Sequence, residues 1–180
     1  NLARLMLSEN DATKFFHVTL TELSTQTGSQ IAAVYLLSDD KKTFEHFESI
    51  GFDDSARQSF AADRFEGEFG LTLSSRKVQH ISNIPENTRF AFHTVSGKFI
   101  PREIITIPII ADYEVIAIIS LASISTYSKQ SVQLIDHILV TLRARVEGII
   151  AYHKMREFSE KLELQNRELE SQKTELSSRG

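Results

Sequence analysis

The feature that most constrains this chain is the stretch over residues 129–178, which contains no proline and one glycine, Gly148. Proline breaks a helix interior, so its absence predicts one continuous helix. At 1.5 Å per residue, a helix of about 50 residues is roughly 75 Å long, longer than one small domain can cover. We therefore expect a compact domain over residues 1–128, followed by an exit helix and coiled-coil linker over residues 129–180.

Apolar residues along this helix form two seams. The first alternates at spacings of 4 and 3: Ile135, Leu139, Leu142, Val146 and Ile149. The second repeats every seven residues: Met155, Leu162, Leu169 and Leu176. The phase slips where they meet, and the second seam is too sparse to be stable alone. We expect both seams to be the interface of a homodimer. With the leucines at d positions, Asn166 takes an a position and favours a parallel two-stranded pair.

Composition narrows the possible functions. The formal net charge is −4 and no basic block occurs, so a nucleic-acid partner is not expected. The chain has no cysteine, which excludes disulfides, thiol nucleophiles and covalently attached bilin and fits a reducing cytoplasm. No apolar run approaches the ~20 residues of a membrane-spanning helix. We expect a cytoplasmic segment of a longer protein, whether or not the parent is membrane-anchored, because the chain starts without methionine and ends within a charged repeat.

The rest of the chain predicts an α+β domain. A helix is expected over residues 2–27, where apolar side chains share one face, and a second, short helix over 53–62. Strands are expected over residues 31–37, 43–50, 78–81, 103–110 and 115–123, and the remainder of 63–102 is expected to be mostly irregular. Pro108 cannot donate a backbone hydrogen bond, so its strand needs a bulge or an unpaired edge at that point.

Several strings resemble the GAF family. Gly67–Leu71 is similar to its Gly-Glu-Gly-Leu turn, Lys77–Pro85 to the stretch that follows, and residues 104–108 with 115–123 to its closing hairpin. The resemblance implies an antiparallel sheet with a helical layer on one face, a ligand cavity under loops on the other, and a long C-terminal coiled-coil helix.

A narrower resemblance concerns the two ends of the chain. Residues 1–4 and 162–170 are similar to GAF modules that lie between a HAMP linker and the kinase core in bacterial sensor histidine kinases, hybrid forms included. This implies a non-catalytic sensor that signals through a dimeric coiled coil to a kinase in the same parent chain. The alternatives are a ligand-free dimerisation and transmission spacer, or the sensor of a diguanylate cyclase or phosphodiesterase.

A ligand site is expected in the loop region, where aromatic residues cluster outside the strands. Plain core packing explains the same aromatics. The candidate ligand-binding residues are Phe65, Phe69, Asn87, Arg89, Phe90, Phe92, His93 and Arg102. The arginines suit a carboxylate or phosphate. His93 is either a haem ligand, a ligand hydrogen-bond partner or an ordinary loop histidine; the sequence requires no cofactor.

The residues that other types of GAF domain use for catalysis or for cyclic-nucleotide binding are missing from this sequence. The methionine sulfoxide reductase type works through cysteines, and the Asn-Lys-Phe-Asp-Glu signature of cyclic-nucleotide GAF domains is missing. The six histidines show no metal-ligand spacing, so no metal site is expected. His137 lies on a helix face without the motif of a phosphoacceptor helix.

Overall fold

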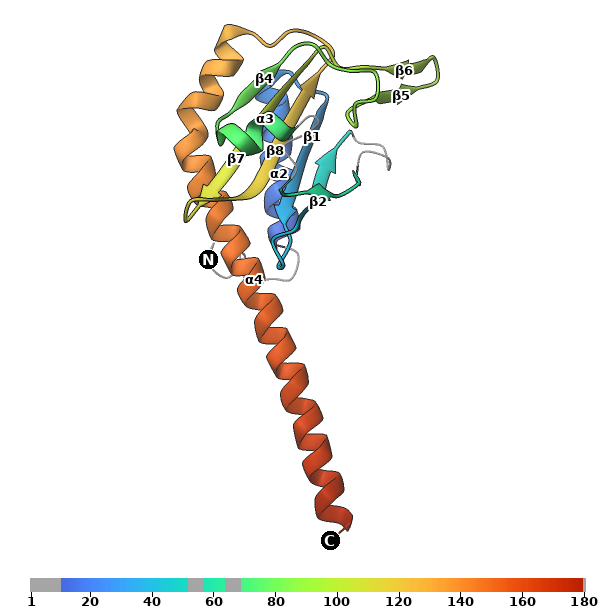
Figure 1. Cartoon of the computed structure of the whole chain (residues 1–180), viewed down its shortest axis with the longest axis vertical. Helices are drawn as coiled ribbons and strands as arrows, with labels where there is room; N and C mark the ends of the chain where they lie inside the picture. Colours follow the sequence, from blue (N-terminus) through green and yellow to red (C-terminus); the bar gives the residue numbers. More distant parts are fainter. Residues whose placement is uncertain (1–10, 52–56, 64–68, 180) are drawn as a thin grey trace.

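The domain is built on a curled six-stranded antiparallel sheet in the order β3-β2-β1-β8-β7-β4 (Figure 1). A computed structural model describes residues 11–51, 57–63 and 69–179. The strands of the sheet are β1 (Ile31–Leu37), β2 (Thr43–Ile50), β3 (Phe60–Ala61), β4 (Gln79–Ile81), β7 (Glu103–Ala111) and β8 (Glu114–Ser123). The two predicted hairpins and the strand near residue 80 are confirmed, because alternating and continuous apolar runs gave strong signals there.

Two helices cover one face of the sheet. α2 (Asp11–Thr27) and the first part of α4 (Lys129–Arg179) share a core with inward-facing residues of β1, β7 and β8. The predicted inner face of α2 is confirmed, since its apolar residues are buried: Ala12, Phe16, Leu20 and Leu23. The opposite face carries the short helix α3 (Gly70–Ser75) and a second core.

α4 is one continuous helix, as expected, but its two halves have different surroundings. Figure 1 shows it passing beside the sheet and then continuing far beyond the domain. The first seam belongs to the core of its own subunit: Ile135, Leu142, Val146 and Ile149 are buried there and Leu139 packs against them. This corrects the expectation that these five residues face a second copy. An a/d pattern requires a covered apolar face, and here the sheet and α2 cover it.

The predicted helix over residues 53–62 is wrong at its end, and its first part, residues 53–56, lies outside the described residues. Phe60 and Ala61 form β3, which pairs with Thr43 and Phe44 of β2. The ring of Phe60 stacks on that of Phe44 with centroids 5.3 Å apart, an aromatic contact that outweighs a weak helical pattern. The stretch expected to be mostly irregular also contains α3 and the small hairpin of β5 (Phe92–Thr94) and β6 (Gly97–Phe99).

Pro108 lies where the sheet leaves room for it. On its outer side, β7 pairs with β4 only through Ile104, Ile105 and Thr106, so no strand of the sheet pairs there beyond Thr106. The β7–β8 register shifts between Ile109 and Ile110. The unpaired edge and the irregularity in pairing, either of which was expected to accommodate the proline, are therefore both present.

Candidate functional site

Aromatic rings gather on the face of the sheet that carries α3. Tyr35 comes from β1, Phe44 from β2, Phe60 from β3, Phe69 from the residue before α3, and Phe90 from the loop before β5. Ring centroids lie 4.6 Å apart for Phe60 and Phe69, 5.2 Å for Tyr35 and Phe60, and 5.8 Å for Phe69 and Phe90. These separations are those of rings in direct contact, so the aromatic side chains of the cluster are closely packed.

Arg89 covers this cluster. Its guanidinium carbon lies 4.9 Å from the ring centroid of Phe60, 5.1 Å from that of Phe69 and 5.5 Å from that of Tyr35. A cation at this distance from an aromatic face gains about 0.5–2 kcal/mol, depending on its desolvation. Arg89 Nη1 also donates a hydrogen bond of 2.9 Å to the Gln58 carbonyl oxygen. Arg89 therefore joins the loop before β5 to the segment leading into β3.

The structure unites only part of the predicted ligand site. Phe69 and Phe90 are buried, and Arg89 lies over Phe69. Asn87 and Arg102 are exposed, and among the described residues neither has a side-chain hydrogen bond or ring contact with the cluster. Phe65 lies outside the described residues, as do the side chains of Phe92 and His93, so the predicted roles of these three stay predictions.

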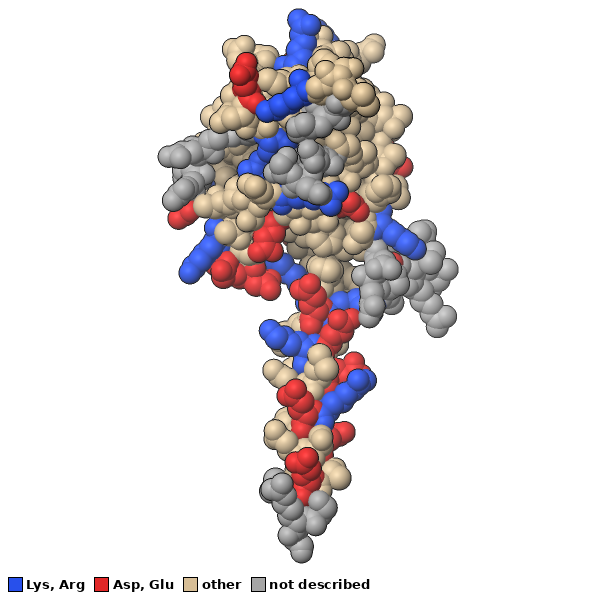
Figure 2. Space-filling model, turned by 90° about the vertical axis from the view of Figure 1, so that its right-hand side faces the viewer, with Lys and Arg blue, Asp and Glu red and all other residues tan. Residues whose placement is uncertain are grey.

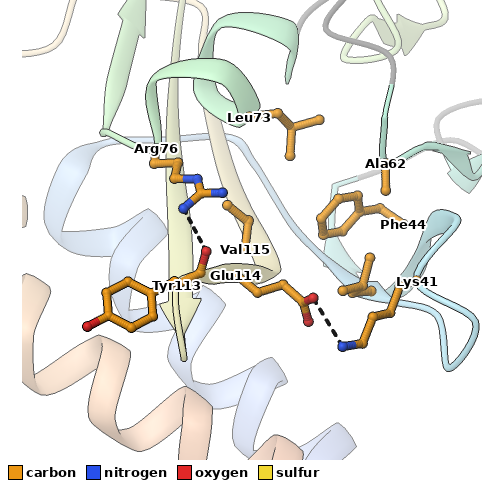
Figure 3. A pocket seen from close by; sticks show the side chains of 9 residues that line it. Lys41, Phe44, Ala62, Leu73, Arg76, Tyr113, Glu114 and Val115 are labelled. Atoms are coloured by element: carbon orange, nitrogen blue, oxygen red, sulfur yellow. Dashed lines mark hydrogen bonds and ion pairs between the residues drawn. The ribbon is translucent and has the colours of Figure 1, made fainter.

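A hollow of about 230 Å³ lies beside the cluster and shares Phe44 with it. Its lining comes from the β1–β2 hairpin, the residue after β3, the end of α3 and the β7–β8 hairpin: Leu37, Lys41, Phe44, Ala62, Leu73, Arg76, Tyr113, Glu114 and Val115. Figure 3 shows apolar side chains around the space and charged groups near its edge. Arg76 Nη1 donates to the Tyr113 carbonyl oxygen at 2.6 Å, and Lys41 Nζ lies 3.2 Å from Glu114 Oε2.

Sequence reasoning missed this hollow. The polar strings around Lys41 and Glu114 did indicate turns, but a turn signal does not say which other turns it will meet. Arg76 ends α3 in the left-handed conformation, with φ of 59°, and no turn residue in the sequence marks that bend. The hollow is a product of tertiary structure that brings together four segments, with Arg76 and Tyr113 37 residues apart in the sequence.

A polar network around the buried Glu103 joins the sheet to the start of α4. Glu103, the first residue of β7, accepts a hydrogen bond of 2.7 Å from the Tyr127 backbone N–H through Oε1, and its Oε2 contacts His80 Nε2 of β4. Tyr127 Oη lies 2.8 Å from Ser29 Oγ, just before β1. Burial raises the pKa of the Tyr127 phenol, so the phenol stays protonated and hydrogen-bonded. The helix start is therefore held to both β7 and the α2–β1 connection.

These features define an α+β module with a small-molecule-sized hollow on one face of its sheet and an exit helix packed on the other. The chain belongs to the GAF domain family, whose family model matches residues 11–160. GAF domains are a regulatory and sensory fold found in many signalling proteins. The match extends into α4, in agreement with the burial of the helix's first seam.

Solved structures share the fold at low sequence identity. The GAF domain of a phosphoenolpyruvate-protein phosphotransferase from Acinetobacter is 17% identical over 78% of this chain and 82% of that chain, with a TM-score of 0.58. A free methionine-R-sulfoxide reductase from Neisseria meningitidis is 14% identical over 85% of this chain and 86% of that one, with a TM-score of 0.60. No curated protein matches the chain.

A third similar structure comes from a protein described as a two-component sensor histidine kinase of Sinorhizobium meliloti 1021. It is 9% identical over 80% of this chain and 96% of that chain, with a TM-score of 0.52. At these identities the likeness concerns the fold alone. No helix in the described part of the chain combines the length and apolarity that crossing a membrane requires.

Proposed function

We propose that this chain is the regulatory, ligand-sensing module of a bacterial signalling protein, and that α4 pairs with a second copy and passes conformational changes to a downstream histidine kinase in the same parent chain. The observation that carries the proposal is the apolar seam on the part of α4 that protrudes from the domain. Met155 is 67% exposed, Leu162 45% and Leu169 61%.

The protruding helix has little support of its own. Figure 2 shows acidic and basic side chains interspersed along it. The i,i+4 pairs Arg156–Glu160 and Arg167–Glu163 have N···O distances of 3.9 and 3.4 Å; the first pair is partly exposed and the second largely exposed. Such pairs contribute only about 0.3–0.5 kcal/mol each, which does not hold so long a helix together in water. A second copy of the same helix covers the leucine seam at d and places Asn166 of each chain at facing a positions.

The place where α4 leaves the domain coincides with the phase slip between its seams. Ile149 and Ile150 are the last residues of α4 in the core, and the ring of His153 still contacts Phe47 of β2, with centroids 5.4 Å apart. Two residues later Met155 faces solvent. The slip therefore separates the face that packs on the sheet from the face that we assign to the partner helix, and a rotation of α4 at this point changes the register of the pair.

The ligand side of the proposal rests on the face that carries α3. Its aromatic cluster and its hollow lie on the side of β1 and β8 opposite the core that contains α4. A change in strand position there reaches α4 through the packed sheet and through the Glu103–Tyr127 hydrogen bond. The kinase as effector is supported by the resemblance of the chain's ends and by the fold of the Sinorhizobium protein.

A ligand-free transmission spacer is the second candidate function. It is favoured by the aromatic cluster, because Arg89 and the closely packed rings occupy the part of this face where the sequence predicted a cavity. Mass spectrometry of small molecules extracted from the purified protein separates the two candidates. A reproducible bound compound supports sensing, whereas its absence from protein purified out of its native host supports the spacer.

Sedimentation equilibrium of the purified chain tests the pairing. We expect a dimer for the natural sequence and a monomer for the double variant Leu162→Ser, Leu169→Ser. Leu164→Ser is the matched control, because Leu164 is 60% exposed on the same helix but lies at an outward-facing f position. A natural chain that stays monomeric at all attainable concentrations, or a control that dissociates as fully as the double variant, refutes the proposed dimer.

A further inference from the structure

We infer that the hollow between the β1–β2 turn, the β7–β8 turn and the end of α3 binds a small organic monocarboxylate with a short apolar tail. The inference names a ligand class for the sensing function proposed above and rests on that function for its regulatory consequence. Binding itself involves only residues of one domain and does not require α4 to pair.

The size and walls of the hollow select a small, partly apolar ligand. Its volume of about 230 Å³ is below the roughly 300–1,000 Å³ of sites that take drug-sized molecules. Leu37, Phe44, Leu73 and Val115 are buried side chains from four different elements, and all four line it. Because these elements are held by the sheet and by α3, the walls are preformed and a branched aliphatic tail gains burial without ordering a loop.

The charged groups select an anion. Among the residues that line the hollow, Arg76 and Lys41 carry a positive charge and Glu114 a negative charge, so the lining itself sums to +1. The Arg76 guanidinium carries five N–H donors in a planar fork, and the Tyr113 carbonyl oxygen engages Nη1. A carboxylate matches the geometry of that fork and forms charge-assisted hydrogen bonds with it. A single negative charge balances the charge of the lining residues, whereas a neutral molecule or a zwitterion does not.

The backbone around the hollow is held in a costly conformation. Among the residues that the structure describes, the non-glycine residues with positive φ are Lys41, Arg76, Asp112 and Tyr113, at 62°, 59°, 50° and 65°. Three of them line the hollow and the fourth precedes Tyr113 in the same turn. The left-handed conformation costs a side-chain-bearing residue roughly 1–2 kcal/mol. Asp112 and Tyr113 form the two-residue β7–β8 hairpin turn, Arg76 is the C-cap of α3 and Lys41 lies in the β1–β2 turn, so these chain reversals fix the positions of the residues that line the hollow.

The hollow also lies where a ligand can influence the exit helix. Glu114 begins β8 and Lys41 lies in the turn after β1, and these are neighbouring strands near the middle of the sheet. A carboxylate that draws Lys41 and Arg76 inward competes with the Lys41–Glu114 ion pair, whose N···O distance is 3.2 Å. The two turns then change their separation, and the opposite face of both strands belongs to the core that contains α4.

The test is an NMR titration of the ¹³C-methyl-labelled chain with sodium 3-methylbutanoate. We expect saturable shifts at the methyl groups of Leu37, Leu73 and Val115. Loss of a charge-assisted hydrogen bond weakens binding about 10-fold or more, so Arg76→Gln should reduce the affinity by at least that factor. Lys77→Gln is the matched control, since Lys77 is the adjacent exposed cation and does not line the hollow. Its affinity should equal that of the natural chain.

Two comparison ligands complete the experiment: 3-methyl-1-butanol, which is neutral, and leucine, which is zwitterionic. Weaker binding of both supports the inference. Absence of saturable shifts in the natural chain, shifts confined to other methyl groups, or binding of either comparison ligand as tight as that of the carboxylate overturns it. The titration of the natural chain tests the inference by itself, even if Arg76→Gln fails to fold. Repeating it in the Leu162→Ser, Leu169→Ser background separates ligand binding from pairing of α4.

Discussion

Replacement of Glu103 tests how the start of α4 is attached to the sheet. Glu103 is 6% exposed, and its carboxylate accepts a hydrogen bond from the Tyr127 backbone N–H at 2.7 Å. A hydrogen bond to a buried charged group contributes about 1.5–3 kcal/mol, and the pair with His80, whose side chain is 38% exposed, adds at most about 1 kcal/mol. We therefore expect Glu103→Ala to lower the free energy of unfolding by about 3 kcal/mol, a large part of a typical total of 5–15 kcal/mol.

Two matched variants divide this effect. Glu103→Gln keeps an acceptor for the Tyr127 N–H but loses the charge, so we expect a loss of about 1 kcal/mol. His80→Ala removes the more exposed partner and should also cost no more than about 1 kcal/mol. Urea unfolding monitored by circular dichroism gives the three values, and the double variant of His80 and Glu103 gives the coupling between them.

Hydrogen exchange supplies a local measurement for the same contact. The Tyr127 amide should be protected in the natural chain and in Glu103→Gln, and should exchange much faster in Glu103→Ala, because only the last variant removes its acceptor. Equal protection in all three proteins, or a loss below about 1 kcal/mol for Glu103→Ala, would show that the carboxylate does not anchor the helix.

Three further predictions concern the domain itself. Thr72→Val should raise the free energy of unfolding by about 1 kcal/mol, because the buried Thr72 hydroxyl has no hydrogen-bond partner in the described part of the chain. Gly28 and Gly51 both have φ near +73°, and Gly28→Ala should lower the free energy of unfolding by roughly 1–2 kcal/mol. Gly51→Ala should lower it by well over that amount, because only at Gly51 would a Cβ lie 2.4 Å from a backbone oxygen. Burial, and next the charge of Arg57, lowers the pKa of His46, so stability should fall as the pH drops below about 6.5, and His46→Gln should flatten this dependence.

Thermal and urea unfolding check all three. A Thr72→Val protein less stable than the natural one would show that the hydroxyl is satisfied. Equal losses for the two glycine variants would contradict the close approach at Gly51. The sign for His46 follows from linkage: when the folded pKa is lowered, the unfolded chain binds more protons below the ordinary value of 6.5, so stability rises with pH in that window. If His46→Gln showed the same pH dependence of stability as the natural chain, His46 would not be the group responsible for it.

The sequence predicted the elements whose signals are local. Residues 129–178 could only be a long helix, and the apolar runs of β7 and β8 could only be central strands. The sequence does not show what an apolar helix face packs against, because that depends on distant residues. The spacing of Val146 and Ile149 fits a coiled coil and a sheet-packed helix equally well, and in the structure both residues pack in the core with the sheet. Phe60 shows the same limit, since its stacking on Phe44 decides for strand over helix.

The candidate site likewise has a part that the sequence could predict and a part that depends on tertiary structure. Phe69 and Phe90 could be placed in one cluster because loop aromatics need burial. The role of Arg89 as a cover over their rings depends on the path of two loops and could not be predicted. The hollow near Arg76 was out of reach for a stronger reason, because it exists only where three separate turns converge.

The pairing of α4 is the claim on which the signalling route depends, and site-directed cross-linking tests it most directly. The chain contains no cysteine, so Asn166→Cys introduces a single thiol at the proposed a position. Parallel helices in register bring the two thiols face to face, with helix axes about 8–10 Å apart. We predict rapid formation of a disulfide-linked dimer under mild oxidation for Asn166→Cys and slow formation for the outward-facing control Leu164→Cys. Equal, slow cross-linking of the two variants would contradict the account.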